Sequence, residues 1–132
     1  MKRSDSRELV MQLLFQMEAQ NDYTKASQEK FIVNFARENI KDQYIDNCIE
    51  AYIANRNDID KLIEEASDKW HINRMAKVDL AILRLAVTEI KFLKDSDVPN
   101  QVSINEAVNM AKKFGSDDSQ KFINGILGKI AK

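Results

Sequence analysis

The stretch "VDLAILRLAVTEIKFL", from Val78 to Leu93, carries apolar residues on nearly every side of the helix that its spacing predicts. A helix of this kind must be covered all round in a soluble protein, so we expect it to be a central helix shared by two packing layers. Arg84 and Glu89 are charged residues inside it. We interpret both as snorkelling or hydrogen-bonded polar groups at a helix junction, because a catalytic role would need partners that the sequence does not show.

Amphipathic segments flank this central helix on both sides. Three glycines and one proline in 132 residues leave few helix breakers. The chain is long enough for one core and short for two. We therefore predict an all-α protein of about seven helices, in a single domain over residues 1–132. The other predicted helices cover about 4–20 (capped by Ser4 or Ser6), 31–39 (ending near Asn39), 44–53, 59–66 (capped by Asn57 or Asp58), 104–111 and 117–130.

The last two helices are joined by a short elbow around Gly115. Ser103 and Glu106 have capping-box spacing, which predicts that they close the start of the first of these helices. Gly115 would end that helix in the left-handed conformation. Ser116 would cap the next one, with Asp117 and Asp118 at its positive end. Gly125 and Gly128, inside the last helix, suggest close approach of another helix.

Composition limits the function classes. The formal net charge of −1 excludes a uniformly basic binder of polyanions, so any nucleic-acid site must be a local patch. The single cysteine, Cys48, cannot form an internal disulfide, and we expect a reduced, half-buried thiol. No apolar run approaches membrane-spanning length and the N-terminus is polar. We expect a cytoplasmic protein that does not enter membranes.

Motifs for catalysis are missing from the sequence. His71 is the one histidine, and no second histidine or cysteine stands at metal-ligand spacing. There is no glycine-rich phosphate loop and no Gly-x-Ser-x-Gly elbow. Solvated faces or helix starts explain the paired carboxylates better than acid–base chemistry does. We therefore expect no enzymatic activity, no metal and no cofactor.

Binding is the remaining class, and two basic clusters could serve it. One contains Lys2, Arg3 and Arg7; the other contains Lys112, Lys113 and Lys121 around the elbow. Phe114 lies beside the second cluster. Its spacing fits the core, but an exposed ring near lysines could also stack on an unpaired base. Periodicity leaves both alternatives open.

Three segments carry longer sequence motifs. "VPNQVSINEAVNMAKKFGSDDSQKFINGIL" contains Ile-Asn-Glu-Ala, Ala-Lys-x-Phe-Gly and Lys-Phe-x-Asn-Gly pieces in that order. "WHINRMAKVDLAILRLAVTEI" precedes them, and "SRELVMQLLFQME" lies in the opening helix. These three segments resemble the C-terminal signature, the preceding block and the opening helix of the NusB family of transcription antitermination factors. Residues from about 20 to 68 carry helical character but no family motif.

The resemblance implies a fold of two three-helix bundles sharing one core. It also implies binding to boxA-type single-stranded RNA in leaders of ribosomal RNA operons, together with the ribosomal protein NusE. That pair joins other Nus factors on RNA polymerase and suppresses premature termination, without catalysis by the NusB protein. Whether the free protein is a monomer or a homodimer stays open.

Family positions can be carried over by residue. The resemblance assigns RNA contacts to the basic N-terminal segment and the elbow, and partner contacts to the opening helix and the start of the central helix. The RNA-binding residues would be Lys2, Arg3, Arg7, Lys113, Phe114, Asp118, Lys121 and Phe122, and the partner-binding residues Phe15 and Asp79.

The N-terminal segment departs from the family pattern. It reads Arg3-Ser4-Asp5-Ser6-Arg7, with fewer arginines than is common and an added acid at Asp5. Fewer phosphate contacts lower affinity and flatten its salt dependence, so we expect weak RNA binding without the protein partner. An alternative is a protein–protein adaptor whose partner makes most RNA contacts. A third is the helical module of some RNA methyltransferases, although no catalytic domain follows here.

Overall fold

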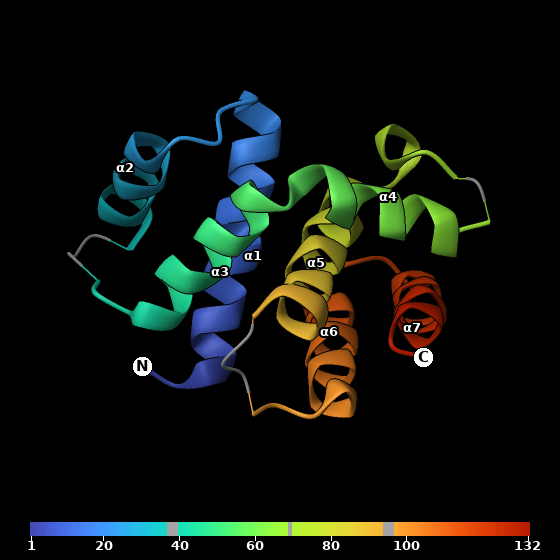
Figure 1. Cartoon of the computed structure of the whole chain (residues 1–132). Helices are drawn as coiled ribbons and strands as arrows, with labels where there is room; N and C mark the ends of the chain where they lie inside the picture. The colour runs from blue at the N-terminus through green and yellow to red at the C-terminus, as the bar shows by residue number, and fades with distance from the viewer. Residues whose placement is uncertain (37–39, 69, 94–96) are drawn as a thin grey trace.

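The computed structural model describes residues 1–36, 40–68, 70–93 and 97–132, and these contain helices and no strand. The prediction of an all-α fold with about seven helices is confirmed (Figure 1). The predicted helix end at Asn39 lies outside the described residues. The α-helices are α1 (Arg3–Gln20), α2 (Lys25–Ala36), α3 (Gln43–Ala54), α4 (Arg56–Ala66), α5 (Lys77–Val87), α6 (Asn100–Phe114) and α7 (Ser119–Ile130).

Helix α5 is the central helix that its sequence predicts. Every residue from Asp79 to Glu89 is buried. Helices α1 and α3 pack against α5 on one side, and α4, α6 and α7 pack against it on the other (Figure 1). A π-helical turn, η2 (Thr88–Phe92), continues α5, and a short 3-10 helix, η1 (Ile72–Arg74), precedes it. The expected arrangement of two bundles, α1–α3 and α5–α7, around one core is confirmed, with α4 resting on α5 and α7.

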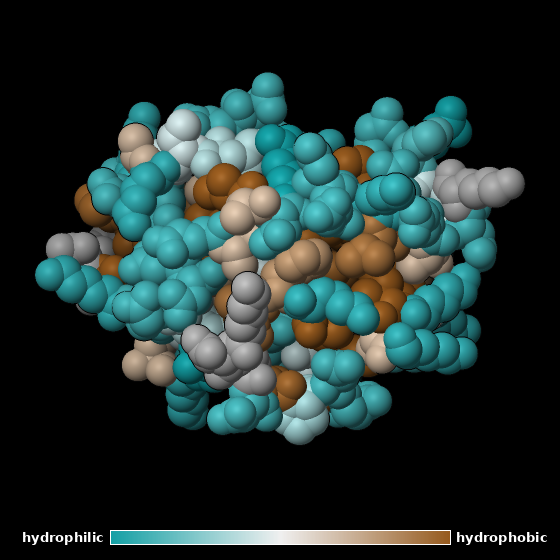
Figure 2. Space-filling model, in the orientation of Figure 1, coloured by the Kyte–Doolittle hydropathy of each residue, from teal (hydrophilic) through white to brown (hydrophobic). Residues whose placement is uncertain are grey.

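The surface is mostly polar. On the face drawn in Figure 2, hydrophobic residues gather chiefly where α4, α5 and α7 meet. No helix of the described residues is long and apolar enough to cross a membrane. Cys48 is fully buried rather than half-buried, and burial raises the pKa of its thiol to about 12. At neutral pH this thiol is protonated and unreactive.

Glu89 holds three helices together at the end of α5. Arg7 of α1 donates to its carboxylate through Nε (3.0 Å) and Nη2 (2.7 Å). Tyr44 of α3 donates its hydroxyl at 2.5 Å, and Ser103 of α6 donates its hydroxyl at 3.0 Å. Burial alone would raise the pKa of Glu89, but the hydrogen bonds and the positive charge of Arg7 outweigh it and lower the pKa. The carboxylate is therefore charged and fully satisfied inside the core.

Arg84 joins a second set of helices in the same manner. Its guanidinium donates two hydrogen bonds of 3.0 Å to Asp60 of α4. It also lies 3.2 Å from the Glu18 carboxylate and donates to the Tyr23 hydroxyl at 3.3 Å. The expectation that Arg84 and Glu89 are hydrogen-bonded groups at helix junctions is confirmed, and each uses the bidentate pairing that stabilises buried charge best.

The predicted capping box at the start of α6 is wrong. Helix α6 begins at Asn100, so Ser103 lies within its first turn. The Ser103 hydroxyl donates to Glu89 instead, and Glu106 accepts from Ser4 (3.3 Å) and pairs with Arg7 (3.4 Å). The buried carboxylate of Glu89 needs donors more than a solvated helix end does, because an unsatisfied buried acceptor is costly.

Other predicted caps are also wrong. Ser6 does not cap α1: its hydroxyl donates to Asp42 (2.5 Å), and Asp42 caps α3 by accepting from the Tyr44 amide. Neither Asn57 nor Asp58 caps α4, because that helix already begins at Arg56 and its flanking residue, Asn55, makes no side-chain capping bond.

The elbow between α6 and α7 differs from its prediction as well. Gly115 has φ −94° and ψ −169°, which is extended and not left-handed. Helix α7 begins at Ser119, whose hydroxyl accepts from the Ser116 amide at 2.9 Å. A side chain at position 115 would place its Cβ 2.5 Å from the Ser119 hydroxyl and 2.8 Å from the Ala111 carbonyl oxygen. Glycine is thus required here for space and not for its conformational freedom.

Gly125 and Gly128 lie in α7 with nothing within 4 Å of their Cβ positions, so the predicted close approach of another helix is wrong. Gly125→Ala and Gly128→Ala should each raise the free energy of unfolding by about 0.5–1 kcal/mol, because alanine restricts the unfolded chain and favours the helix. Thermal unfolding would show a midpoint higher by a few degrees. The matched control, Gly115→Ala, should lower it, and a fall for all three variants would contradict the open surroundings.

The Glu89 cluster predicts a specific acid sensitivity. A glutamate whose pKa is lowered by folding contributes stability that is fully present above its unfolded pKa, about 4.3, and is lost as pH falls through the folded value. Glu89→Gln should cost about 3–5 kcal/mol at pH 7 by leaving Arg7 poorly paired. The difference from the parent should shrink below about pH 4. Urea unfolding from pH 3 to 7 measures this, with exposed Glu65→Gln as the control; a pH-independent difference would contradict it.

Candidate nucleic-acid interface

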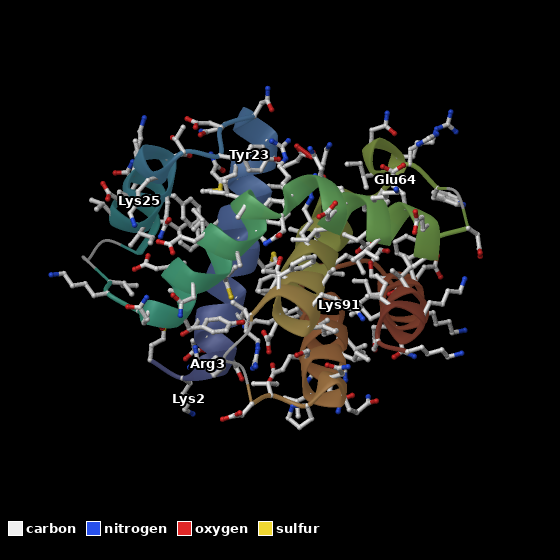
Figure 3. The ribbon with its side chains drawn as sticks, viewed as in Figure 1. Lys2, Arg3, Tyr23, Lys25, Glu64 and Lys91 are labelled. Atoms are coloured by element: carbon white, nitrogen blue, oxygen red, sulfur yellow. The ribbon has the colours of Figure 1, made fainter. Side chains whose placement is uncertain are left out.

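Lys2 and Arg3 lie exposed at the start of α1 (Figure 3). The Arg3 guanidinium stacks over the ring of Tyr44, 4.1 Å from its centroid. This contact holds the cation in place at the surface, and the hydroxyl of the same tyrosine is fixed by Glu89. Lys2 and Arg3 are therefore accessible cations at positions determined by the core.

Arg7 does not belong to this surface. Its exposed fraction is 4%, and its guanidinium is engaged by Glu89 and Glu106. The prediction of Arg7 as an RNA contact therefore conflicts with its position in the structure. Position 7 lies one turn after Arg3, on the side of α1 that carries the buried Val10 and Leu14, so it falls inside the core, whereas Arg3 lies at the exposed end of the helix.

Lys113 lies in the last turn of α6 and reaches α1. Its ammonium group is 2.8 Å from one Glu8 carboxylate oxygen and donates to the other at 3.2 Å. It also lies 5.2 Å from the centre of the Phe114 ring. The lysine side chain is largely exposed, so this ion pair contributes little to stability. A phosphate could replace the carboxylate at small cost.

Phe114 lines an apolar hollow, which answers the question that periodicity left open. The ring is half-buried and packs against the core. Its hollow has a volume of about 300 Å³ and lies between α1, α2, the start of α5 and the end of α6. Phe15, Phe31, Phe35 and Val78 line it with Phe114. The structure thus brings together the predicted RNA residue Phe114 and the predicted partner residue Phe15, and we call this site the aromatic hollow.

Helix α2 contributes two aromatic residues to the aromatic hollow. Phe31 and Phe35 stack with ring centres 5.0 Å apart, and Phe35 is 56% exposed. Val33 on the same helix is also exposed. Four of the five residues at positions 31–35 are apolar, which exceeds what one buried stripe requires, and this excess was the available signal for a binding surface.

Asp79 stands beside the aromatic hollow, next to Val78 at the start of α5. Its exposed fraction is 8%, and its Oδ1 has no hydrogen-bond partner among the described residues. Buried acceptors are normally satisfied, so such an oxygen marks a position where a donor from another molecule would be favourable.

The remaining predicted RNA residues lie at the start of α7. Asp118 and Lys121 are exposed, whereas Phe122 is half-buried against the core. Lys121 faces a polar groove between α6 and α7, away from the aromatic hollow. The structure therefore divides the predicted residues among three places: the start of α1, the aromatic hollow and the start of α7.

Within the described chain, no three His, Cys, Asp or Glu side chains are grouped so that they could hold a metal ion. His71 is exposed and lies 2.9 Å from Glu64. A lone surface pair of this kind provides no catalytic arrangement.

Comparison with known proteins decides the family. A sequence model described as the NusB family matches residues 4–132. The chain belongs to the NusB family. It is 48% identical to the transcription antitermination protein NusB of Agathobacter rectalis, over 99% of this chain and 100% of that protein.

Solved NusB structures share the fold. The structure of T. maritima NusB has a TM-score of 0.84 and 35% identity, covering 99% of this chain and 91% of that one. A chain in the crystal structure of the antitermination factors NusB and NusE in complex with dsRNA has a TM-score of 0.83 and 24% identity, covering 98% and 95%. At that identity the second likeness shows the fold alone.

The two N-terminal arginines of this NusB-family protein should respond differently to substitution. Arg7→Ala should lower the free energy of unfolding by about 3–5 kcal/mol, because it leaves the buried Glu89 charge unpaired. Arg3→Ala should cost under about 1 kcal/mol, the worth of an exposed cation–π contact. Chemical denaturation measures both, and equal losses would contradict the assignment of Arg7 to the core.

Proposed function

We propose that this NusB-family protein is a transcription antitermination factor that binds boxA-type RNA of ribosomal RNA leaders together with NusE. In this role it acts in the cytoplasm, as one RNA-binding domain over residues 1–132, with other Nus factors on RNA polymerase. It suppresses premature termination by binding alone and catalyses no reaction. The family match over residues 4–132 supports this function.

The observation that carries the proposal is that Phe114 lies between an apolar site and a basic side chain. Its ring lines the aromatic hollow with Phe15, and Lys113 lies 5.2 Å from its centre at the rim. A partner protein that fills the hollow would remove water from around this lysine and strengthen its attraction for a phosphate. Partner and RNA would then bind next to each other and each would favour the other.

Asp79 supports the partner half of the proposal. Its Oδ1 is shielded from solvent in the free protein, so a NusE donor would reach it only after a local shift at the start of α5, and would then satisfy a buried acceptor. Phe15 and Phe35 supply the exposed aromatic area that typically anchors a protein interface.

The RNA half uses the accessible cations. Lys2, Arg3, Lys113 and Lys121 would neutralise phosphates and position a single strand. Phe114 and Phe122, both half-buried, would offer ring edges to unstacked bases. Asp118 could accept from a base amino group, although its place before α7 also stabilises the positive end of that helix.

A second candidate function is an adaptor that contacts RNA little by itself. Two observations favour it: Arg7 is buried, and Lys113 is paired with Glu8. Both reduce the number of cations that are free to meet phosphates, as does the acid at Asp5. The two candidates differ in where RNA crosslinks appear, on this chain or on its partner.

Binding to a boxA-like RNA and to a scrambled control, each with and without NusE, tests the proposal. We expect weak binding with a shallow salt dependence for the isolated protein, and selective, tighter binding with NusE. Phe15→Ala should weaken NusE binding about tenfold or more, because buried aromatic anchors dominate interfaces. Calorimetry and salt titration provide the measurements.

Val102→Ala is the control, since Val102 is exposed on α6 but does not line the aromatic hollow. Crosslinks that map only to NusE would favour the adaptor. Tight, strongly salt-dependent binding by the isolated protein would overturn the dependence on the partner, and a lack of selectivity with NusE present would overturn the proposed function itself.

A further inference from the structure

A polar groove of about 510 Å³ runs between α6 and α7, on the side of Lys121. Its walls come from both helices that meet at the elbow. The lining residues are Asn105, Val108 and Asn109 of α6 and Gln120, Lys121 and Asn124 of α7. We call it the amide groove, because four of these six side chains are carboxamides.

The groove lining contains no carboxylate, although 21 of the 132 residues are Asp or Glu. Each carboxamide offers two donor hydrogens and an acceptor oxygen. Lys121 adds one positive charge at the elbow end. The site is therefore suited to a ligand with neutral donor and acceptor edges and a nearby negative charge, and unsuited to a cation.

Most of these amides are unused by the protein. Gln101 donates to the Asn105 Oδ1 at 2.9 Å, which fixes that side chain and leaves its NH₂ group directed elsewhere. The side chains of Asn109, Gln120 and Asn124 make no hydrogen bond within the described part of the chain. They form no hydrogen bond that holds α6 against α7, and both helices bury apolar residues in the core, among them Ile104, Ala111 and Ile123.

The elbow gives the groove a fixed shape. Gly115 allows Ser119 to approach the end of α6, and the Ser116 amide donates to the Ser119 hydroxyl at 2.9 Å. The last turn of α6 and the first turn of α7 are thus set at a defined angle. The two helix backbones that carry the amides are thus preorganised, which favours selectivity.

We infer that the amide groove is a base-reading site for single-stranded RNA. Unpaired bases expose the donor and acceptor edges that asparagine and glutamine match, and Val108 provides an apolar floor for a base plane. Lys121 would hold the adjoining phosphate. This inference rests on the proposed RNA-binding function and adds to it the residues that would select sequence.

Paired variants separate base reading from phosphate contact. Asn109→Ala combined with Asn124→Ala should lower the preference for a boxA-like RNA over its scrambled form by about tenfold, within the range for losing amide–base pairs, while the salt dependence stays the same. Lys121→Ala should weaken both RNAs equally and reduce the salt slope by about 0.7. Asn57→Ala, an exposed asparagine on α4, is the control.

All measurements use the full chain with NusE present, after circular dichroism has shown that each variant is folded. Crosslinking of 4-thiouridine-substituted boxA-like RNA gives a second readout, with crosslinks expected in peptides that contain residues 105–109 and 120–124. A folded double variant that keeps its selectivity, with no crosslinks in these peptides, would overturn the base-reading site and leave the proposed function standing. If the parent protein with NusE does not distinguish the boxA-like RNA from its scrambled form, both the base-reading site and the proposed function would be overturned.

Discussion

The carboxylate of Glu89 is the interaction on which the arrangement of surfaces depends. It accepts from Arg7, Tyr44 and Ser103, which belong to α1, α3 and α6. A buried charge must be satisfied by geometry as well as by opposite charge, so these helices cannot shift independently. Arg3 stacks on Tyr44 and Lys113 extends from α6, and both cations therefore inherit their positions from one core contact.

The ion pair between Arg7 and Glu89 removes one positive charge from the surface. An arginine near the N-terminus can pair either with a buried carboxylate or with a phosphate, and Arg7 pairs with Glu89. Glu8, the next residue, faces outward and pairs with Lys113. The start of α1 therefore contributes less positive charge to the surface than its sequence suggests. Charge attracts every RNA alike, so phosphate contacts at the start of α1 would add affinity without adding selectivity.

The periodicity of apolar residues was sufficient to predict the helices and the central position of α5, and it marked Arg84 and Glu89 as polar groups at helix junctions. It failed at helix ends. A serine hydroxyl can cap a helix or form a hydrogen bond elsewhere. Ser103 donates to Glu89, and Ser119 lies against Gly115 at the elbow, and both contacts depend on tertiary structure. Arg7 and Glu89 are 82 positions apart in the sequence, and local residue spacing cannot predict a contact over that separation. Phe114 was undecided for the same reason: the aromatic hollow needs α1 and α2 as well as α6.

The elbow between α6 and α7 both fixes the turn between these helices and borders two surface sites. Its tight turn requires glycine at position 115, and that turn separates two sites of different chemistry. The aromatic hollow, on the α1 side, is suited to a protein because it is apolar and carries an unsatisfied acceptor nearby at Asp79. The amide groove, between α6 and α7, is suited to unpaired bases because its lining has free amide donors, no carboxylate and one lysine. Since residues of α6 line both sites, a protein in the hollow and an RNA in the groove would be held next to each other by one helix.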